Sequence, residues 1–214
     1  MFMSSCAAAR PSPTDSARFA LGLALGFGLS LTLAALAGQA LVETLLPFTR
    51  APLLWLDDRF EILALGVDRN LQDTVIRLRV NATEMIVVGW QAALPEAGQW
   101  LEVTTTVGAM LQPLVIALGL AAAWPGKFAA RLLRIAIAMT LAISFMLIDI
   151  PVTLHAYVWD MYIYAYDPNH FSSLLIWHEF MHAGGRLGVG VLMGVVSALL
   201  GSRLRERPRI LSAL

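Results

Sequence analysis

The chain has 214 residues, of which 58% are hydrophobic and 14% are charged, and its formal net charge is zero. A soluble domain carries roughly 45–50% apolar and about 25% charged residues, so this composition favours a membrane protein. The balanced charge argues against a nucleic-acid partner. The one cysteine, Cys6, excludes a disulfide framework and a thiolate metal site.

Four long apolar runs predict the fold class, an all-α membrane protein with four transmembrane helices and a small antiparallel β insert between helices 1 and 2. Each run can cover the ~30 Å hydrocarbon core of the bilayer. In chain order we expect a cytoplasmic tail at 1–18, helix 1 at 19–48, an extracytoplasmic β-rich domain at 49–104, helix 2 at 105–124, a cytoplasmic loop at 125–131, helix 3 at 132–158, an extracytoplasmic loop at 159–171, helix 4 at 172–202 and a cytoplasmic tail at 203–214.

Basic residues set the expected orientation. They cluster before the first run, between the second and third, and after the fourth: Arg10, Arg18, Lys127, Arg131, Arg134, Arg203, Arg205, Arg207 and Arg209. Positive charge stays in the cytoplasm, which predicts a bacterial inner-membrane protein with both termini cytoplasmic. The string Ala35-Leu36-Ala37 leaves an alternative, because it resembles a signal-peptidase site whose cleavage would remove the first span.

The insert changes from helical to alternating periodicity. Thr74–Val80 places Ile76 and Leu78 on one face and Arg77 and Arg79 on the other, as in a half-buried strand. Weaker strand candidates are Phe60–Val67, Glu84–Trp90 and Gln99–Val107. We expect a three- or four-stranded antiparallel meander. It is too small to be stable alone, so it should lean on the spans or on a partner protein, which its edge strands could pair with.

The string His178-Glu179-Phe180-Met181-His182 is an H-E-x-x-H match at the start of the fourth run. On a helix, the two histidines point at one ion, and Glu179 could activate a zinc-bound water as catalytic base. The string resembles the zincin metalloprotease motif over five residues. The third histidine of the extended pattern falls on Gly188, so a third ligand would come from His155, His170, Asp149 or Asp160.

A structural interpretation of the same residues competes with the metal site. Glu179 and Arg186 are seven residues apart, two turns along one helix face, and can form an ion pair. Asp149 lies beside Pro151, where a kink would open backbone groups to it. Charged groups inside a span are expensive, so Asp149, His155 and Glu179 also suggest a proton relay or small transporter.

Two G-x-x-x-G strings follow in the fourth run, at Gly184 and Gly188 and at Gly190 and Gly194. Small residues at this spacing let two helices approach closely. They predict either packing within the chain or a homo-oligomer.

The layout is similar to that of the small membrane proteins associated with exosortase systems, especially those beside exosortase H. The resemblance rests on the single N-terminal span, the β-rich insert, the string Leu111-Gln112-Pro113-Leu114-Val115-Ile116-Ala117-Leu118 and the basic turn before Leu132. It implies an accessory role in sorting or assembling envelope proteins. The exosortases themselves use a membrane cysteine, which this chain lacks.

The sequence therefore favours a non-enzymatic accessory protein of the inner membrane, which contacts the lipid bilayer and a protein partner through residues 50–104 and needs no cofactor. Two alternatives stay open. One is a zinc-dependent membrane hydrolase with His178, His182 and His155 as ligands, and the other is a transporter or proton relay.

Overall fold

The computed structural model describes residues 13–70, 72–93 and 99–211. Cys6 and Arg10 lie outside the described residues, as do the side chains of Arg18, Arg205, Arg207 and Arg209. The described helices are α1 (Pro13–Leu56), α2 (Val107–Ala123), α3 (Phe128–Tyr166), α4 (Ser173–Phe180), the π-turn η1 (Met181–Gly185) and α5 (Arg186–Leu211). The described strands are β1 (Phe60–Asn70), β2 (Asp73–Ala82), β3 (Ile86–Val88), β4 (Gln91–Ala93) and β5 (Leu101–Thr106).

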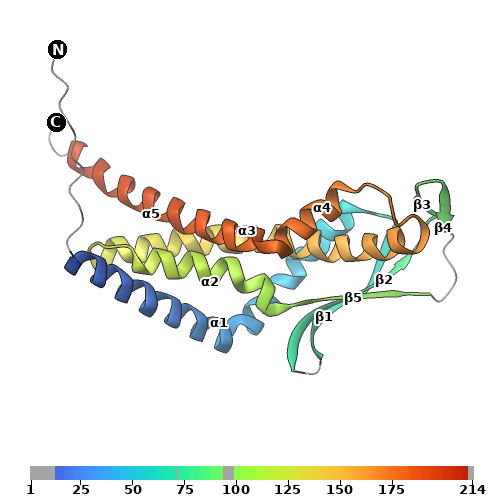
Figure 1. Ribbon diagram of the computed structural model, residues 1–214, viewed down its shortest axis with the longest axis horizontal. Coiled ribbons are helices and arrows are strands. Elements are labelled where there is room, and N and C mark those ends of the chain that lie inside the picture. Colours follow the sequence, from blue (N-terminus) through green and yellow to red (C-terminus); the bar gives the residue numbers. More distant parts are fainter. Residues whose placement is uncertain (1–12, 71, 94–98, 212–214) are drawn as a thin grey trace, which may run out of the picture.

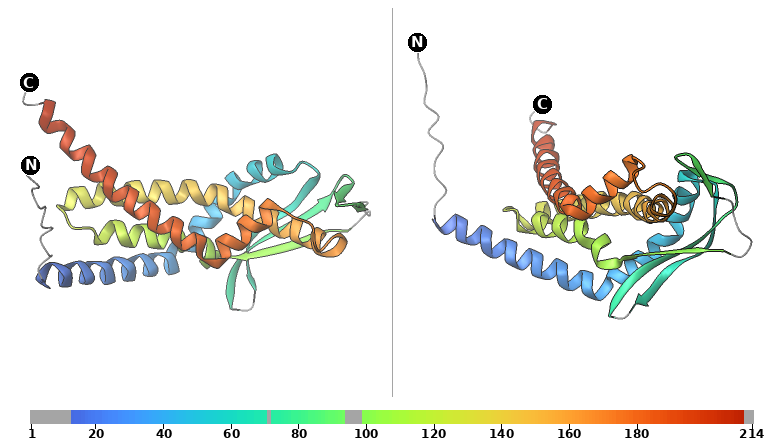
Figure 2. Two further views of the ribbon diagram at one scale, coloured as in Figure 1. Left: turned by 45° about the horizontal axis from the view of Figure 1, so that its top comes forward. Right: turned by 45° about the vertical axis from the view of Figure 1, so that its right-hand side comes forward.

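Helices α1, α2, α3 and α5 lie side by side as a bundle at one end of the molecule, and the strands gather at the other end (Figures 1 and 2). Among the described residues, three helical stretches are long and apolar enough to cross a membrane: Phe19–Leu56, Phe128–Tyr166 and Ser173–Arg203. This agrees with the expected membrane protein. α2 has 17 residues and is shorter than these, so the fourth crossing stays a prediction.

Two helices extend well beyond the expected spans. α1 runs to Leu56 through Pro47 and Pro52, and α3 runs to Tyr166 through residues that we expected in a loop. The extensions stay helical because their apolar side chains find partners outside the bundle: Leu53 of α1 and Ile163 of α3 are both buried. Secondary structure beyond the bundle is thus set by packing against the strands.

Glycines allow the close helix approaches. A Cβ on Gly26 of α1 would lie 2.7 Å from the carbonyl oxygen of Gly119 on α2. A Cβ on Gly190 of α5 would meet Pro113 at 3.0 Å, and one on Gly194 would meet Leu120 at 2.7 Å. Gly190 and Gly194 therefore pack within the chain. Gly184 and Gly188 have no such neighbour within 4 Å, and the homo-oligomer through them stays a prediction.

Strands β1, β2 and β5 form an antiparallel sheet in the order β1-β2-β5. The predicted alternation of β2 is confirmed, because Ile76, Leu78 and Val80 are at most 3% exposed while Arg77 and Arg79 point away. The sheet is not a simple meander, since β3 and β4 pair only with each other among the described strands. A tight turn with Gly89 at φ +58° joins β3 and β4 into a separate hairpin. The second edge of β2 therefore pairs with β5.

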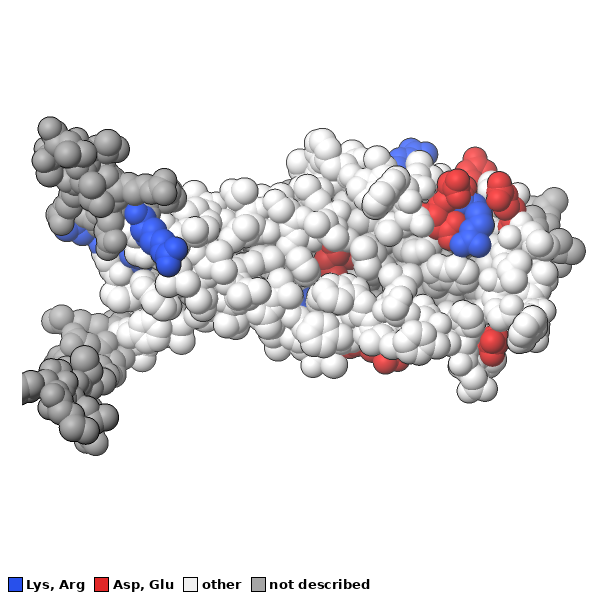
Figure 3. Space-filling view, turned by 90° about the horizontal axis from the view of Figure 1, so that it is seen from above, with Lys and Arg blue, Asp and Glu red and all other residues white. Residues whose placement is uncertain are grey.

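The apolar face of the sheet packs on the second half of α3, and the charged face points outwards. We call residues 57–106 the sheet domain. On its outer face, Arg77 contacts Asp68 and Glu102 at 3.1 Å each, and Arg79 also binds Glu102, which links all three strands. Figure 3 shows basic side chains at the bundle end, both signs of charge at the sheet end and a mostly uncharged surface between them.

Candidate functional site

The H-E-x-x-H segment does not sit on a continuous helix. α4 ends at Phe180, a π-turn follows, and Gly184 has φ +118°, which breaks the helix before α5 begins at Arg186. Residues other than glycine rarely adopt this backbone conformation. The break turns the chain, so that Glu179 is exposed whereas Arg186 is only 2% exposed.

Arg186 binds Asp149 of α3 in the interior of the bundle. Its Nε donates to Asp149 Oδ2 at 2.8 Å and its Nη2 donates to Thr153 Oγ1 at 2.7 Å. The two charged side chains are each 2% exposed. The expected pair of Glu179 with Arg186 is not formed, because the break at Gly184 removes the common helix face on which that expectation depended.

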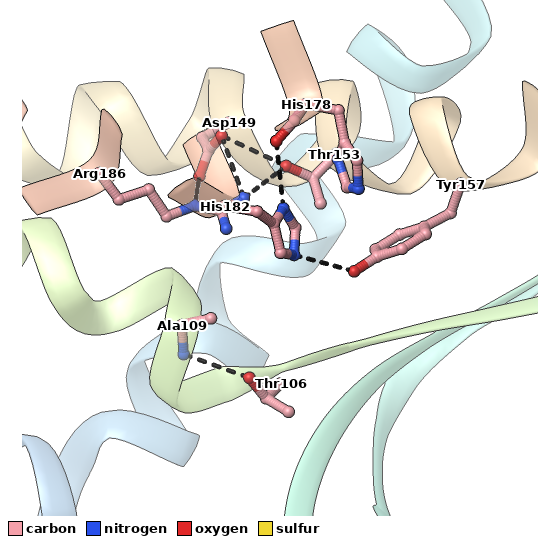
Figure 4. A network of polar contacts seen from close by, with 8 residues as sticks. All are labelled: Thr106, Ala109, Asp149, Thr153, Tyr157, His178, His182 and Arg186. Carbon is pink, nitrogen blue, oxygen red and sulfur yellow. Dashed lines mark hydrogen bonds and ion pairs between the residues drawn. The ribbon is translucent and has the colours of Figure 1, made fainter. Parts of the chain in front are cut away.

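His178 and His182 lie together beside Tyr157 of α3 (Figure 4). Their ring centroids are 4.3 Å apart, and the Tyr157 hydroxyl lies 3.0 Å from His182 Nε2. His182 Nδ1 lies 3.2 Å from the carbonyl oxygen of His178. A carbonyl only accepts, so Nδ1 carries the proton of the neutral ring and Nε2 accepts from Tyr157. His178 Nδ1 is buried and has no hydrogen-bond partner within the described structure.

His155 is separated from this histidine pair. It lies two residues before Tyr157 on α3, which places it on nearly the opposite side of the helix. Its Nε2 is 4.0 Å from Asp57 Oδ2, and its ring contacts Phe60 and Trp159 edge-on. Within the described part of the chain, no three His, Cys, Asp or Glu residues are grouped as a metal site. Of the other expected donors, Asp149 binds Arg186, and His170 lies 3.7 Å from Asp167.

A second ion pair, which the sequence analysis missed, lies in the connection between α1 and β1. Arg59 donates from Nε to Asp57 Oδ1 at 2.8 Å and from Nη2 to Oδ2 at 2.6 Å. Burial opposes ionisation of Asp57, but the hydrogen bonds and charge of Arg59 outweigh it, and the pKa of Asp57 is lowered. The Arg59 guanidinium also lies 5.3 Å from the ring centre of Trp159. The sequence signal was the string Asp57-Asp58-Arg59 directly after an apolar helix.

Two cavities adjoin at the boundary between the bundle and the sheet domain. The first, about 870 Å³, lies between Tyr157, His182 and the polar residues Asn70, Gln72 and Thr104. The second, about 940 Å³, runs down the bundle between α1 and α2. Asp73, Thr106 and Ala109 line both cavities, so we describe them together as the lateral groove. Gln112, a polar residue inside an apolar run, was the sequence signal for it.

Comparison of the chain with models of known protein families, with curated proteins and with solved structures found no match. The function is therefore argued from the geometry of the chain itself.

Proposed function

We propose that this chain is a non-enzymatic accessory protein of the bacterial inner membrane, which holds a partner protein at the free edge of β1. In the proposed placement, α1, α2, α3 and α5 cross the bilayer, both termini are cytoplasmic, and the sheet domain is extracytoplasmic. The basic side chains at the bundle end and the mostly uncharged surface beside them support this placement (Figure 3).

The observation that carries the proposal is the open edge of β1. This strand has one described neighbour in the sheet, β2. From Leu63 onwards its residues are exposed or half-buried, and Leu63, Ala64 and Asp68 are exposed. An edge strand presents unpaired N–H and C=O groups that an extended segment of another chain can pair with. A β-bulge lies between Ile62 and Ala64, and regular pairing with β2 continues from there to Asn70. Ala64–Asn70 therefore offers seven consecutive residues as a template.

The seating of the sheet makes this edge a stable docking surface. The apolar face of the sheet is occupied by α3, with Phe60 against His155 and Tyr162. The other face is tied by the ion pairs of Arg77 and Arg79. The charged face already satisfies its own charges, so a partner strand would pair at a sheet edge, and β1 is one of the two edge strands. The resemblance to exosortase-associated proteins adds the expectation that this partner takes part in sorting or assembling envelope proteins.

The geometry favours the accessory role over the two alternatives. The zinc hydrolase with His155, His178 and His182 as ligands is disfavoured, because His155 faces Asp57 instead. A proton relay through Asp149, His155 and Glu179 needs these groups in sequence, but Asp149 is held by Arg186 and Glu179 is exposed. Metal analysis tests the first alternative directly: about one zinc per chain, lost on changing both His178 and His182 to Ala, would favour the hydrolase.

Site-specific photo-crosslinking tests the proposal. A photoreactive amino acid at Leu63 should give a discrete adduct with one partner protein in cells. The same group at Met85 is the matched control, because both side chains are 51% exposed in the sheet domain. Leu63→Lys should abolish the adduct formed from a photoreactive group at Ala64, since an edge lysine opposes strand pairing, whereas Met85→Lys should leave it. Equal crosslinking from Leu63 and Met85, or none from either, would overturn the proposal.

A further inference from the structure

The lateral groove changes in character along its length. Its lower part is lined by apolar side chains of α1 and α2, including Phe27, Leu31 and Val115. Its upper part is lined by Gln39, Gln112 and Asp73, and it continues towards Tyr157 and His182. The groove is therefore amphipathic along its axis, with an apolar half and a polar half.

The contacts between α1 and α2 give the depth order of the groove. The two helices are antiparallel, with Gly22 against Ala123, Gly26 against Gly119 and Gly38 against Leu111. α2 begins directly after β5, so Gly38 and Leu111 lie near the sheet domain. The 17 residues of α2 span about 25 Å, close to the ~30 Å of the hydrocarbon core. In the membrane placement proposed above, its first residue therefore lies at headgroup level, and the apolar half of the groove lies at acyl-chain level.

The polar half carries one negative charge. Among the described residues that line the two cavities, Asp73 is the only carboxylate, and none is Lys or Arg. Asp73 lies on the exposed end of β2 and has no ion pair within 4.0 Å in the described part of the chain. Around it, the amide of Gln112 and the hydroxyls of Thr74 and Thr106 can donate hydrogen bonds, while the amide of Gln39 also donates to Glu43 at 2.8 Å.

We propose that the lateral groove binds one phospholipid with a primary-amine headgroup, from the leaflet on the side of the sheet domain. An acyl chain lies in the apolar half along Leu31 and Val115. The ammonium group binds Asp73, and the amides and hydroxyls nearby donate to the phosphate and ester oxygens. This inference rests on the proposed membrane placement and not on a partner at β1, although the two surfaces share Asn70, which ends the β1 template and lines the first cavity.

Charge selects this lipid class over the other candidates. Anionic lipids bind proteins through basic pockets, and the lining residues supply no Lys or Arg for them. A straight transmembrane helix of a partner is disfavoured as the occupant. Asp73 and Thr74, at the β1–β2 turn, line the same cavity as Leu31 of α1, so the strands close the outer end of the lateral groove. A flexible lipid can bend at this point and a helix cannot.

Lipid analysis of the purified full chain tests the proposal. The protein is reconstituted in bilayers of equal phosphatidylethanolamine and phosphatidylglycerol, re-extracted in mild detergent, and the retained lipids are quantified. We expect enrichment of phosphatidylethanolamine, which Asp73→Asn should reduce several-fold. Asp68→Asn is the control, because Asp68 lies on the same β-hairpin and lines neither cavity.

A second pair of variants tests the acyl half. Ala35→Trp should fill the slot and lower the total retained lipid, whereas Leu36→Trp should not, because Leu36 is 80% exposed and lies outside the groove. Retained lipid with the bulk composition, or enrichment unchanged by both Asp73→Asn and Ala35→Trp, would overturn the proposal. So would a partner protein that crosslinks to residue 31, because a protein segment would then occupy the slot.

Discussion

The bundle and the sheet domain both contain arginine–carboxylate pairs, but in different surroundings. In the bundle, Arg186 and Asp149 are each 2% exposed and join α5 to α3. On the sheet, Arg77 is 26% and Glu102 25% exposed, and the pairs join neighbouring strands near water. Removing one partner of the buried pair leaves the other charge without water. Removing one partner of a sheet pair leaves the other charge hydrated. The same chemistry therefore fixes the bundle but contributes little to the sheet.

The buried pair gives the largest expected effect. Arg186→Met should lower the free energy of unfolding by about 3–5 kcal/mol, because Asp149 is then buried without its partner. Thermal unfolding in detergent, followed by tryptophan fluorescence, measures the loss. Adding Asp149→Leu should recover part of it, since the orphaned charge is removed. Equal stability of Arg186→Met and the native chain would show that Asp149 reaches water. The contrast between the buried pair of the bundle and the exposed pairs of the sheet would then be wrong.

The Asp57–Arg59 pair lies between these extremes, with the Asp57 side chain 4% and the Arg59 side chain 31% exposed. Asp57→Asn should cost about 1.5–3 kcal/mol, the usual range for hydrogen bonds to a charged group. Because the folded pKa of Asp57 is lowered, this stabilisation is present above the unfolded pKa and is lost as the pH falls through the folded value.

Unfolding midpoints measured at about pH 7 and about pH 3 should therefore show a large gap between the native chain and Asp57→Asn at the higher pH and a smaller one at the lower. Arg59→Gln is the matched control, because Arg59 and His155 face Asp57. The difference in unfolding midpoint between the native chain and Arg59→Gln should likewise be smaller at the lower pH. A gap that grows on acidification would contradict the assignment.

The break at Gly184 should give a smaller effect. Gly184→Ala places a Cβ on a residue with φ +118° and should cost at least about 1 kcal/mol. Gly188→Ala is the matched control, because Gly188 lies in regular helix and its Cβ would meet nothing within 4 Å. That variant should be neutral or slightly stabilising in the same unfolding measurement. Equal midpoints for the two variants would show that the break is not needed to seat Arg186.

The sheet network should give the smallest effect. Glu102→Gln removes the carboxylate shared by Arg77 and Arg79, and each pair is partly exposed. The expected loss is less than about 1 kcal/mol and should shrink in high salt. Unfolding measured at low and high salt checks both points. A salt-independent loss as large as that of Arg186→Met would remove the distinction between the two regions.

The sequence predicted the apolar helices and the alternation of β2, because both depend on the periodicity of local residues. It did not predict that α1 and α3 continue past the bundle, since Leu53 and Ile163 are buried by contacts distant in sequence. The site was predicted in part. His178 and His182 do meet, but the partner of Arg186 was assigned on the assumption of one continuous helix, and a single positive φ at Gly184 changes the face on which Arg186 lies.

The length of α3 has a practical consequence for dissecting this protein. Its 39 residues extend about 58 Å, nearly twice the ~30 Å hydrocarbon core. This one helix therefore packs in the bundle and also against the sheet domain. The segment between α1 and α2, cut out and expressed by itself, would leave behind the surface that covers Phe60 and Ile76. It is not a portable module, and any chimera or graft that carries the strands must carry the outer half of α3 with them.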